Sequence, residues 1–162
     1  MTSKIVTNIL FSLFIFFFFA TAHGADYAAY LDSINDSNAT GYVSLSISGG
    51  VIAGYAEGSG LESDILASDC TADNCMGIHV HEGMSCVDAD SQGGHYYYTD
   101  EDPWATSVYN HTTTSGKTDP TYAFVNVNIG LDTDDLRKRA FIMHDFSGGR
   151  VACGLLVLLP TK

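Results

Sequence analysis

The sequence predicts an all-β fold, a Greek-key antiparallel β-sandwich or flattened barrel of about eight short strands with long loops. Three observations support this prediction. Apolar and polar residues alternate in several short runs, which is the spacing of side chains on the two faces of a strand. Gly-containing turns separate several of these runs, without the strand–helix alternation that builds parallel sheets. The stretches between other runs are rich in Gly, Asp, Ser and Thr, which favours loops.

The strands are expected in one β domain over residues 41–162. Residues 41–48 alternate between apolar and serine side chains, and residues 51–55 begin a returning strand. Gly49-Gly50 between them favours the tight turn of a hairpin. The other expected strands or edges cover residues 61–65, 78–82, 123–129, 140–144 and 150–159.

Three segments lie outside these strands. Residues 23–40 are rich in Ala, Asp, Ser and Asn, so we expect a loose lead-in with a helical turn near residues 27–31. Residues 83–121 have few apolar runs and are expected to form a long loop, of the kind that is usually functional or tied down. Residues 132–138 are the only helix-like polar run.

The N-terminus has the layout of a secretory signal peptide. Lys4 precedes an apolar block over residues 9–20, and the small residues Ala20-Thr21-Ala22 follow. We therefore expect residues 1–22 to be removed and the protein to be secreted, extracellular or at the cell surface. An uncleaved anchor is the alternative, although the block is shorter than the roughly 20 apolar residues of a membrane span. No second block of this kind follows, so no integral membrane domain is expected after cleavage.

Charge and cysteine content narrow the class of protein further. Asp and Glu number 19 against 7 Lys and Arg, which disfavours a nucleic-acid or anionic-membrane partner. Four cysteines in an exported chain should form two disulfides, and three connectivities are open for Cys70, Cys75, Cys86 and Cys153. Cys70 and Cys75 bracket a segment that we expect to be a small cross-linked loop. Asn-x-Ser/Thr patterns make three asparagines candidate glycosylation sites, Asn35, Asn38 and Asn110.

The histidines indicate a metal site. His79 and His81 are one residue apart in an apolar alternation, so both fall on the same face of a strand. Burying two unpaired imidazoles would cost about 1–3 kcal/mol each, and a metal ion would remove that cost. His95 and His144 complete a four-nitrogen set, which suits copper(II) better than most other metals. The two remaining histidines, His23 and His111, are expected to be structural.

Four fragments of the sequence resemble the copper/zinc superoxide dismutases. These fragments are GIHVHEG at residues 77–83, GGH at 93–95, MHD at 143–145 and GRVACG at 149–154. The resemblance extends over residues 42–156 in order and spacing. It implies that His79, His81, His95 and His144 hold one copper ion per chain. It also implies that Arg150 is the catalytic, anion-guiding residue, that Cys86 pairs with Cys153, and that superoxide is the substrate.

Two departures from the family pattern point to its extracellular copper-only branch. The family's zinc subsite needs two further histidines and an aspartate, but only His111 follows His95 in this region. Only five residues separate His144 from Arg150, where the family has a long charged loop. The resemblance therefore implies a secreted copper-dependent superoxide dismutase, with glycan acceptor sites and disulfides, that lacks a zinc subsite.

Three alternative functions stay open at this stage. The first is a non-catalytic extracellular copper-binding protein on the same fold. The second is a zinc enzyme that holds a metal-bound water on His79, His81 and one more histidine. The third is a copper site on the terminal amine and ring of His23 after cleavage behind Ala22.

Several residues near the predicted histidine site have either two possible roles or a supporting role. Arg137-Lys138-Arg139 either adds to a local positive field or caps the helix-like run before it. The aromatic residues of the long loop either pack it onto the barrel or line the site, and they are Tyr96, Tyr97, Tyr98 and Trp104. Glu82 and Asp145 directly follow predicted ligands and so point to the opposite face, which predicts a role as loop anchors.

Overall fold

The structure is a computed structural model and describes residues 24–118 and 122–160. The predicted signal peptide and His23 lie outside these residues. Within them, no helix is both long enough and apolar enough to cross a membrane.

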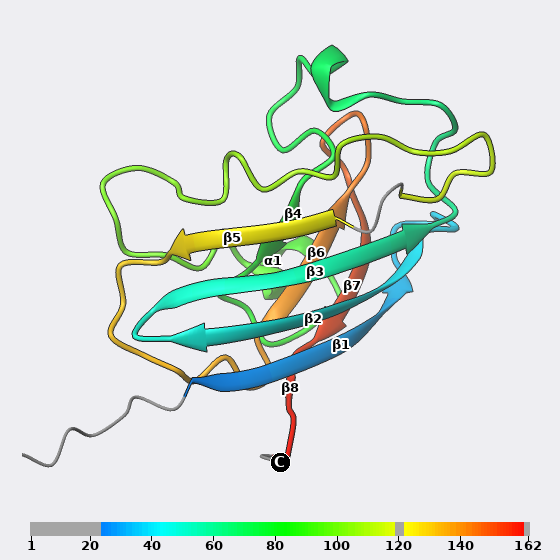
Figure 1. The fold of residues 1–162 in the computed structure, drawn as a ribbon. Coiled ribbons are helices and arrows are strands. Elements are labelled where there is room, and N and C mark those ends of the chain that lie inside the picture. The colour runs from blue at the N-terminus through cyan, green and yellow to red at the C-terminus, as the bar shows by residue number, and fades with distance from the viewer. Residues whose placement is uncertain (1–23, 119–121, 161–162) are drawn as a thin grey trace, which may run out of the picture.

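Eight antiparallel strands form one strongly curled sheet, which confirms the predicted all-β class (Figure 1). The sheet order is β4-β6-β7-β1-β2-β3-β5, and β8 pairs with β1 beside this path. Strand β7 follows β6 through a tight turn and pairs with β1, so the late strands lie beside the first strand, as in Greek-key folds. The strands are β1 (Ala25–Ser33), β2 (Thr40–Ser48), β3 (Val51–Ser59), β4 (Ile78–Val80), β5 (Tyr122–Asn128), β6 (Ala140–His144), β7 (Arg150–Leu155) and β8 (Val157–Leu158).

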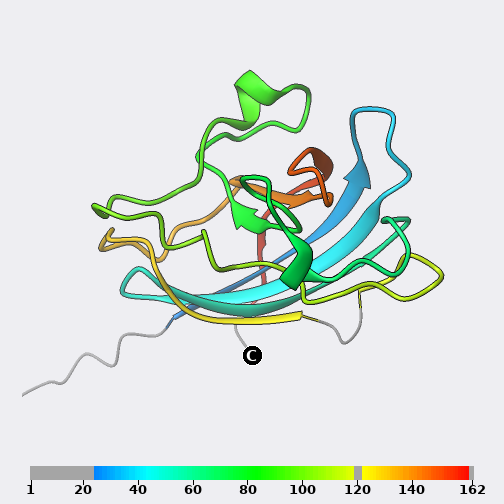
Figure 2. The same ribbon diagram turned by 90° about the horizontal axis from the view of Figure 1, so that it is seen from above.

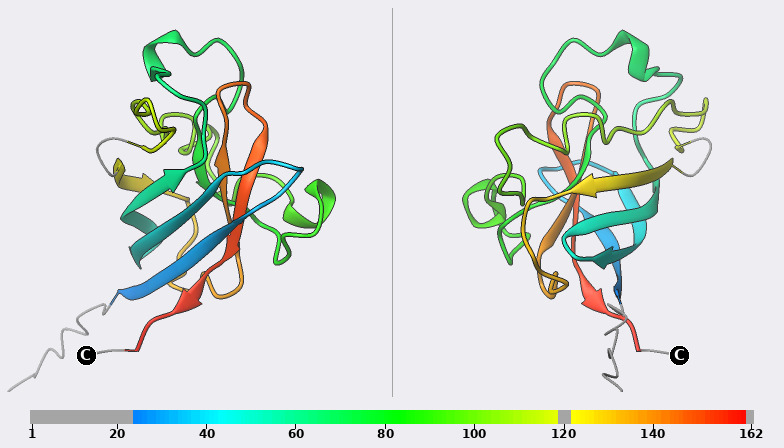
Figure 3. Two further views of the ribbon diagram at one scale, coloured as in Figure 1. Left: turned by 90° about the vertical axis from the view of Figure 1, so that its right-hand side faces the viewer. Right: turned by 60° about the vertical axis from the view of Figure 1, so that its left-hand side comes forward.

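The curl of the sheet produces two facing walls. Strands β1, β2, β3 and β5 form one wall, and β4, β6 and β7 form the other (Figures 2 and 3). Strand β1 takes part in both walls. Its Tyr27 pairs with Leu45 of β2 in the first wall, whereas its Asp32 pairs with Cys153 of β7 in the second. The main core fills the space between the walls. Its largest fully buried side chains include Trp104, Tyr27, Tyr109, Phe141, Leu31, Ile47 and Ile52.

The predicted hairpin is present. β2 and β3 pair along their full length around Gly49 and Gly50, whose φ angles of 55° and 75° are those that glycine adopts most readily. The walls approach closely at the other end of β3. A Cβ atom on Gly58 would lie 2.6 Å from the sulfur of Met143, so only glycine lets β3 contact β6 in this way. This contact brings the end of β3 in one wall close to β6 in the other.

Strand β1 corrects the expectation of a loose lead-in with a helical turn over residues 23–40. Its Ala, Asp and Ser residues have low β propensity, and this misled the interpretation of the sequence. The alternation is nevertheless present, because Tyr27, Ala29 and Leu31 are buried while Asp26, Tyr30 and Asp32 are not. Pairing with β2, β7 and β8 stabilises the strand where local propensity does not.

Two further expectations are wrong. Residues 61–65 are not a strand, because Asp64 has a φ of 57° and the backbone of Leu61 bonds to Gly116 in a neighbouring loop. Residues 132–138 are not a helix, because their backbone groups bond elsewhere. The carbonyl of Thr133 accepts from Gly50, and the amide of Lys138 donates to Leu156, between β7 and β8.

The long loop predicted over residues 83–121 is present as far as the structure describes it, up to residue 118, and is tied down at several points. It contains one short helix, α1 (Ala89–Gln92), capped by Asp88. A disulfide joins Cys86 to Cys153 of β7, and a second joins Cys70 to Cys75 in the loop before β4. Trp104 and Tyr109 belong to this loop, and their side chains are fully buried in the main core, which favours the packing role for Trp104. Tyr98, by contrast, is 81% exposed.

Candidate metal centre

Strand pairing places the predicted histidines on one face. His79 lies opposite Ile142 of β6, and His144 lies two residues further along that strand, so His79 and His144 share a face of the sheet. His81 follows β4 on the same face and forms an isolated bridge with His95 of the long loop. The opposite face of β4 and β6 carries the apolar core residues Ile78, Val80, Phe141 and Met143. The histidines thus lie outside the main core, beneath the long loop.

The four rings converge. One nitrogen of each of His79, His81, His95 and His144 lies within 4.8 Å of the corresponding nitrogen of every other ring, and the group could hold a metal ion. The centroids of the His79 and His95 rings are 4.1 Å apart, and those of His81 and His95 are 5.0 Å apart. His79, His81 and His144 are at most 2% exposed. The side chain of His95 is 11% exposed and is the most accessible of the four.

The hydrogen bonds of the rings show which nitrogen faces the centre. The Nδ1–H of His81 donates to the carbonyl of Gly93 at 3.0 Å, and that of His144 donates to the carbonyl of Gly148 at 2.9 Å. Their Nε2 atoms, and Nδ1 of His79, are buried without a hydrogen-bond partner. Unpaired buried acceptors of this kind are costly, and a metal ion at the centre would satisfy all three. The residues therefore fit a metal ion.

Asp102 orients the fourth ring. The Nδ1–H of His95 donates to Oδ2 of Asp102 at 2.5 Å, which leaves Nε2 of His95 for the centre. Oδ1 of Asp102 accepts from the backbone N–H of Trp104 at 2.8 Å, and the Trp104 indole donates to the carbonyl of Tyr96. Histidine ligands of metals commonly donate to a carboxylate in this way. The sequence analysis missed Asp102, because it lies in irregular chain next to two other acidic residues and no periodicity relates it to His95.

Burial keeps the rings neutral. It lowers the pKa of His79 well below its ordinary value, and the neighbouring rings of the cluster add to this effect. Burial likewise lowers the pKa of His81 to about 3 and that of His144 to about 4. Neutral imidazole is the form that binds metals, so these three rings are ready to bind at neutral pH.

Arg150 lies at the edge of the cluster, opposite His144 in the β6–β7 ladder. A bulge between Met143 and His144 shifts the register there, and bulges re-aim side chains beside functional sites. The half-buried guanidinium donates to the carbonyl of Ala89 at 2.9 Å and to that of Gly93 at 2.8 Å. Its positive charge contributes to the lowered pKa of both His81 and His144. The carbonyl of Gly93 thus accepts from Arg150 and from His81 together.

Two hollows connect the cluster with solvent. His79 and Asp102 contribute to the wall of one hollow, beside the loop closed by the Cys70–Cys75 disulfide. His95 contributes to the wall of the other, together with Tyr97 and Tyr98. A small solute could approach the rings from either side.

The predicted loop anchors behave as expected. The Oε1 atom of Glu82 accepts from the backbone N–H of Gly94 at 3.2 Å, just before His95. The Oδ1 atom of Asp145 accepts from the backbone N–H groups of Ser147 and Gly149, in the tight turn between β6 and β7. Each carboxylate fixes the loop next to one histidine of the cluster.

Two residues of the basic run before β6, Arg137 and Arg139, make different contacts. Arg137 pairs with the exposed Asp135, and no helix is present for the run to cap. Arg139 lies 4.1 Å from the centre of the Tyr96 ring and donates to the carbonyl of Glu82. Arg139 therefore places a second positive charge near the cluster. His111, expected to be structural, bridges to Leu66 outside the cluster.

All three candidate glycosylation sites lie on the surface. Asn35, Asn38 and Asn110 are each exposed. Asn35 lies in the turn between β1 and β2, where its side-chain amide donates to the carbonyl of Arg150 at 3.0 Å. The hydroxyl of Ser37, in the same Asn-x-Ser pattern, donates to the carbonyl of Val151. This pattern therefore contacts the beginning of β7.

Comparisons with protein-family models and with curated proteins find no match for this chain.

The single tryptophan offers a direct test of metal binding. The ring centroids of Trp104 and His79 are 6.2 Å apart. We expect copper(II) to quench most of the tryptophan fluorescence, with an end point at one equivalent, because a paramagnetic ion held by His79 would lie close to the indole. A His79→Ala variant should lose this quenching, whereas His111→Ala should retain it. Quenching that is equal in both variants would contradict the site.

Asp102→Asn should weaken metal binding by about 10- to 100-fold, which is the usual effect of removing an outer hydrogen-bond partner of a histidine ligand. The measurement is copper competition against a chelator of known affinity. Asp100→Asn is the matched control, because Asp100 is exposed and lies in the same loop. Equal affinities in the two variants would show that Asp102 does not orient His95.

The lowered histidine pKa values predict acid destabilisation of the metal-free protein. Below pH 6.5 the unfolded chain binds protons on His81 and His144, whereas the folded protein binds them only near pH 3 and 4. The free energy of unfolding should therefore fall between pH 7 and 5, by up to about 1.4 kcal/mol per pH unit for each ring. Urea unfolding at these pH values measures it. A double variant, His81→Gln with His144→Gln, should have a clearly smaller slope, and an unchanged slope would refute this account.

Proposed function

We propose that this protein is a secreted, copper-dependent superoxide dismutase that uses one copper ion per chain and has no zinc subsite. The observation that carries the proposal is the convergence of four imidazole rings, of which one nitrogen each lies within 4.8 Å of the others. Three of these rings have a buried nitrogen without a partner, and all three are held in the neutral form. The sequence resemblance to copper/zinc superoxide dismutases agrees with the same four residues.

The donor set favours copper over other metals. It consists of nitrogen atoms alone, and all four cysteines are used in disulfides, so no thiolate is available. Four imidazole nitrogens suit copper(II), whereas magnesium, calcium and manganese favour oxygen ligands. A hydrolytic zinc site keeps three protein ligands and an open position for water. The fourth ring, from His95, therefore argues against the zinc-enzyme alternative.

The hydrogen bond between His95 and Asp102 supports a site for one metal. Asp102 accepts from Nδ1 of His95, so this nitrogen is engaged within the protein. A ring that joined two metals would need both of its nitrogens as ligands. His95 accordingly serves a single ion in this proposal.

When bound, copper would supply a one-electron couple, so that two superoxide ions and two protons become dioxygen and hydrogen peroxide. The chain itself has two tasks. The carbonyls of Gly93 and Gly148 and the carboxylate of Asp102 hold the histidine rings in fixed orientations. Arg150 presents a positive charge beside His81 and His144, where an approaching anion is attracted. Its contacts with α1 and Gly93 prevent the guanidinium from turning away.

Local charge has to overcome the charge of the whole molecule. The chain carries a formal net charge of −12, which repels an anionic substrate. Arg150 and Arg139 are the basic residues that contact the loops around the cluster. We assign to them the local attraction of superoxide.

The disulfides indicate an oxidising environment of the extracellular type. Secretion through the predicted signal peptide of residues 1–22 is part of the proposal. The disulfide between Cys86 and Cys153 also has a local effect, because it joins the loop before α1 to β7 three residues from Arg150. It helps to keep the cation beside the cluster.

Superoxide decay tests the function and the role of Arg150 together. The copper-loaded protein should accelerate decay, added zinc should not increase the rate, and His144→Ala should abolish it. Arg150→Ala should slow decay by about tenfold or more and weaken its dependence on ionic strength, because steering of a charged substrate has effects of this order.

Arg137→Ala is the matched control, because Arg137 is exposed and paired with Asp135. It should leave the rate and its salt dependence close to those of the unmodified protein. A copper-loaded protein without activity would instead identify a non-catalytic copper binder on the same fold. An unchanged salt profile in Arg150→Ala would remove the steering role alone.

A further inference from the structure

Two exposed tyrosines and one partly buried tyrosine lie on the outer face of the wall that does not carry the metal centre. Tyr30 of β1 is 80% exposed, Tyr55 of β3 is 43% exposed, and Tyr42 of β2 lies between them. Strand alternation directs their neighbours Leu31 and Val43 into the core, so the tyrosines point away from it. None of them takes part in the proposed dismutase site.

The three rings form a continuous row across the strands. Tyr30 and Tyr42 are directly paired in the β1–β2 ladder, with ring centroids 5.2 Å apart. Tyr55 lies diagonally from Tyr42 on β3, and these two centroids are 6.1 Å apart. Together these residues form what we call the tyrosine face. Large exposed aromatic rings in one row are unusual on a soluble protein and mark sites of interaction.

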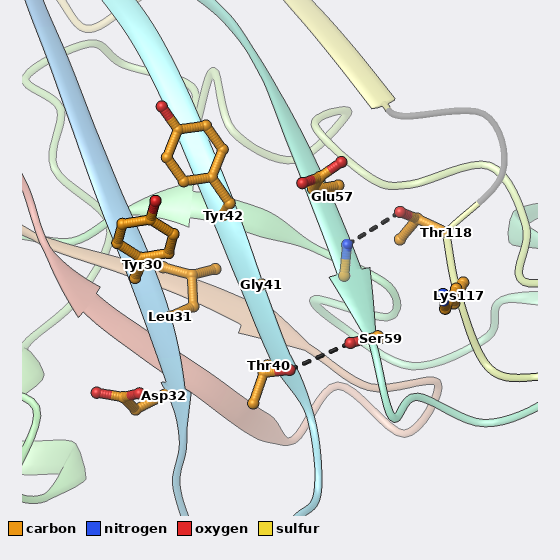
Figure 4. A pocket seen from close by; sticks show the side chains of 11 residues that line it. Tyr30, Leu31, Asp32, Thr40, Gly41, Tyr42, Glu57, Ser59, Lys117 and Thr118 are labelled. Atoms are coloured by element: carbon orange, nitrogen blue, oxygen red, sulfur yellow. Dashed lines mark hydrogen bonds between the residues drawn. The ribbon is translucent and has the colours of Figure 1, made fainter.

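A polar hollow of about 490 Å³ borders this row at one end (Figure 4). Tyr30 and Tyr42 form one side of it, and Glu57 lies beside Tyr42 on the next strand. Around them are hydrogen-bonding side chains from three strands and one loop, which are Asp32, Thr40, Ser59, Lys117 and Thr118. Gly41 and Gly58 also border the hollow, but only with their backbone, because a side chain at either position would point into the core. The hollow therefore offers both donors and acceptors next to two flat rings.

A second hollow of about 630 Å³ borders the other end of the row, where Tyr55 forms part of its wall. Its floor carries the short side chains of Ser44, Ser46 and Ala53. The row of rings thus joins two shallow hollows. An extended ligand could cross the strands by following this path.

We propose that the tyrosine face binds an uncharged polysaccharide, with sugar rings stacked on the tyrosines and hydroxyl groups bonded in the two hollows. The apolar face of a pyranose ring matches a flat aromatic ring, and tyrosine supplies that surface at low conformational cost. The carboxylates of Asp32 and Glu57 accept hydrogen bonds from pairs of hydroxyls. This inference is independent of the proposed dismutase function, because it uses the opposite wall of the fold.

Charge favours an uncharged ligand over the other candidates. Asp32 and Glu57 are both exposed on this face, and the net charge of the chain is −12, so polyanions are repelled. A second copy of the chain is also disfavoured, since the two hollows are lined by three carboxylates, Asp26, Asp32 and Glu57, against one cation, Lys117, so two such faces repel each other. A neutral polymer meets no such repulsion.

The test is depletion of the purified protein from solution by insoluble cellulose, β-1,3-glucan and chitin. We expect retention on at least one of them. Tyr30→Ala with Tyr42→Ala should weaken binding by about tenfold or more, the order that loss of an aromatic stacking surface costs. Tyr30→Phe should bind like the unmodified protein, because it keeps the ring. Tyr98→Ala is the matched control, since Tyr98 is as exposed as Tyr30 but lies beside His95.

Several results would overturn the proposal. They are retention on none of the three polymers, retention that the double variant leaves unchanged, and equal retention on the polyanion polygalacturonate. A concentration-dependent doubling of mass in sedimentation that the double variant abolishes would assign the face to self-association instead. Copper-dependent quenching of Trp104 in each variant verifies that the fold is intact, without relying on dismutase activity.

Discussion

Three buried histidine rings each keep one nitrogen without a partner in the protein, and the rest of the architecture serves to hold those nitrogens together. Such an arrangement is unfavourable on its own, because buried acceptors lose their bonds to water. It persists because the β4–β6 ladder fixes His79 and His144 on one face, while carbonyls and a carboxylate fix the other ring nitrogens. The fold therefore contributes the free energy that the site alone lacks.

The apolar core and the metal centre lie on opposite faces of strands β4 and β6. The apolar core fills the space between the two walls, and the histidines lie on the other face of β4 and β6 under a long loop. That loop has little regular structure, so the disulfide between Cys86 and Cys153 and buried aromatic side chains hold it in place. The carbonyl oxygen of Gly93 accepts hydrogen bonds from both His81 and Arg150, so one atom orients a ring and restrains a cation. A small displacement of α1 would disturb a ring and a cation at once.

Much of this architecture could be predicted from local pattern, and the errors have physical causes. The hairpin of β2 and β3 follows from alternation around two glycines, and the pairing of His79 with His81 follows from strand periodicity. Strand β1 could not be predicted, because pairing with β2 and with the distant strands β7 and β8 stabilises it rather than its own propensity. Asp102 could not be found either, since its position depends on how Trp104 packs. The sequence pattern therefore located the rings better than the residue that orients one of them.

The Asn35-x-Ser37 pattern has a consequence for the order of events during biosynthesis. Both of its polar side chains are engaged with consecutive carbonyls, those of Arg150 and Val151. An oligosaccharyltransferase needs access to the asparagine nitrogen and to the hydroxyl two residues later. Once the last strands dock against this turn, both groups are engaged in hydrogen bonds, although Asn35 itself is exposed. Docking of the C-terminal strands therefore competes with recognition of this pattern, so any sugar transfer to Asn35 would be favoured while that segment is still unfolded.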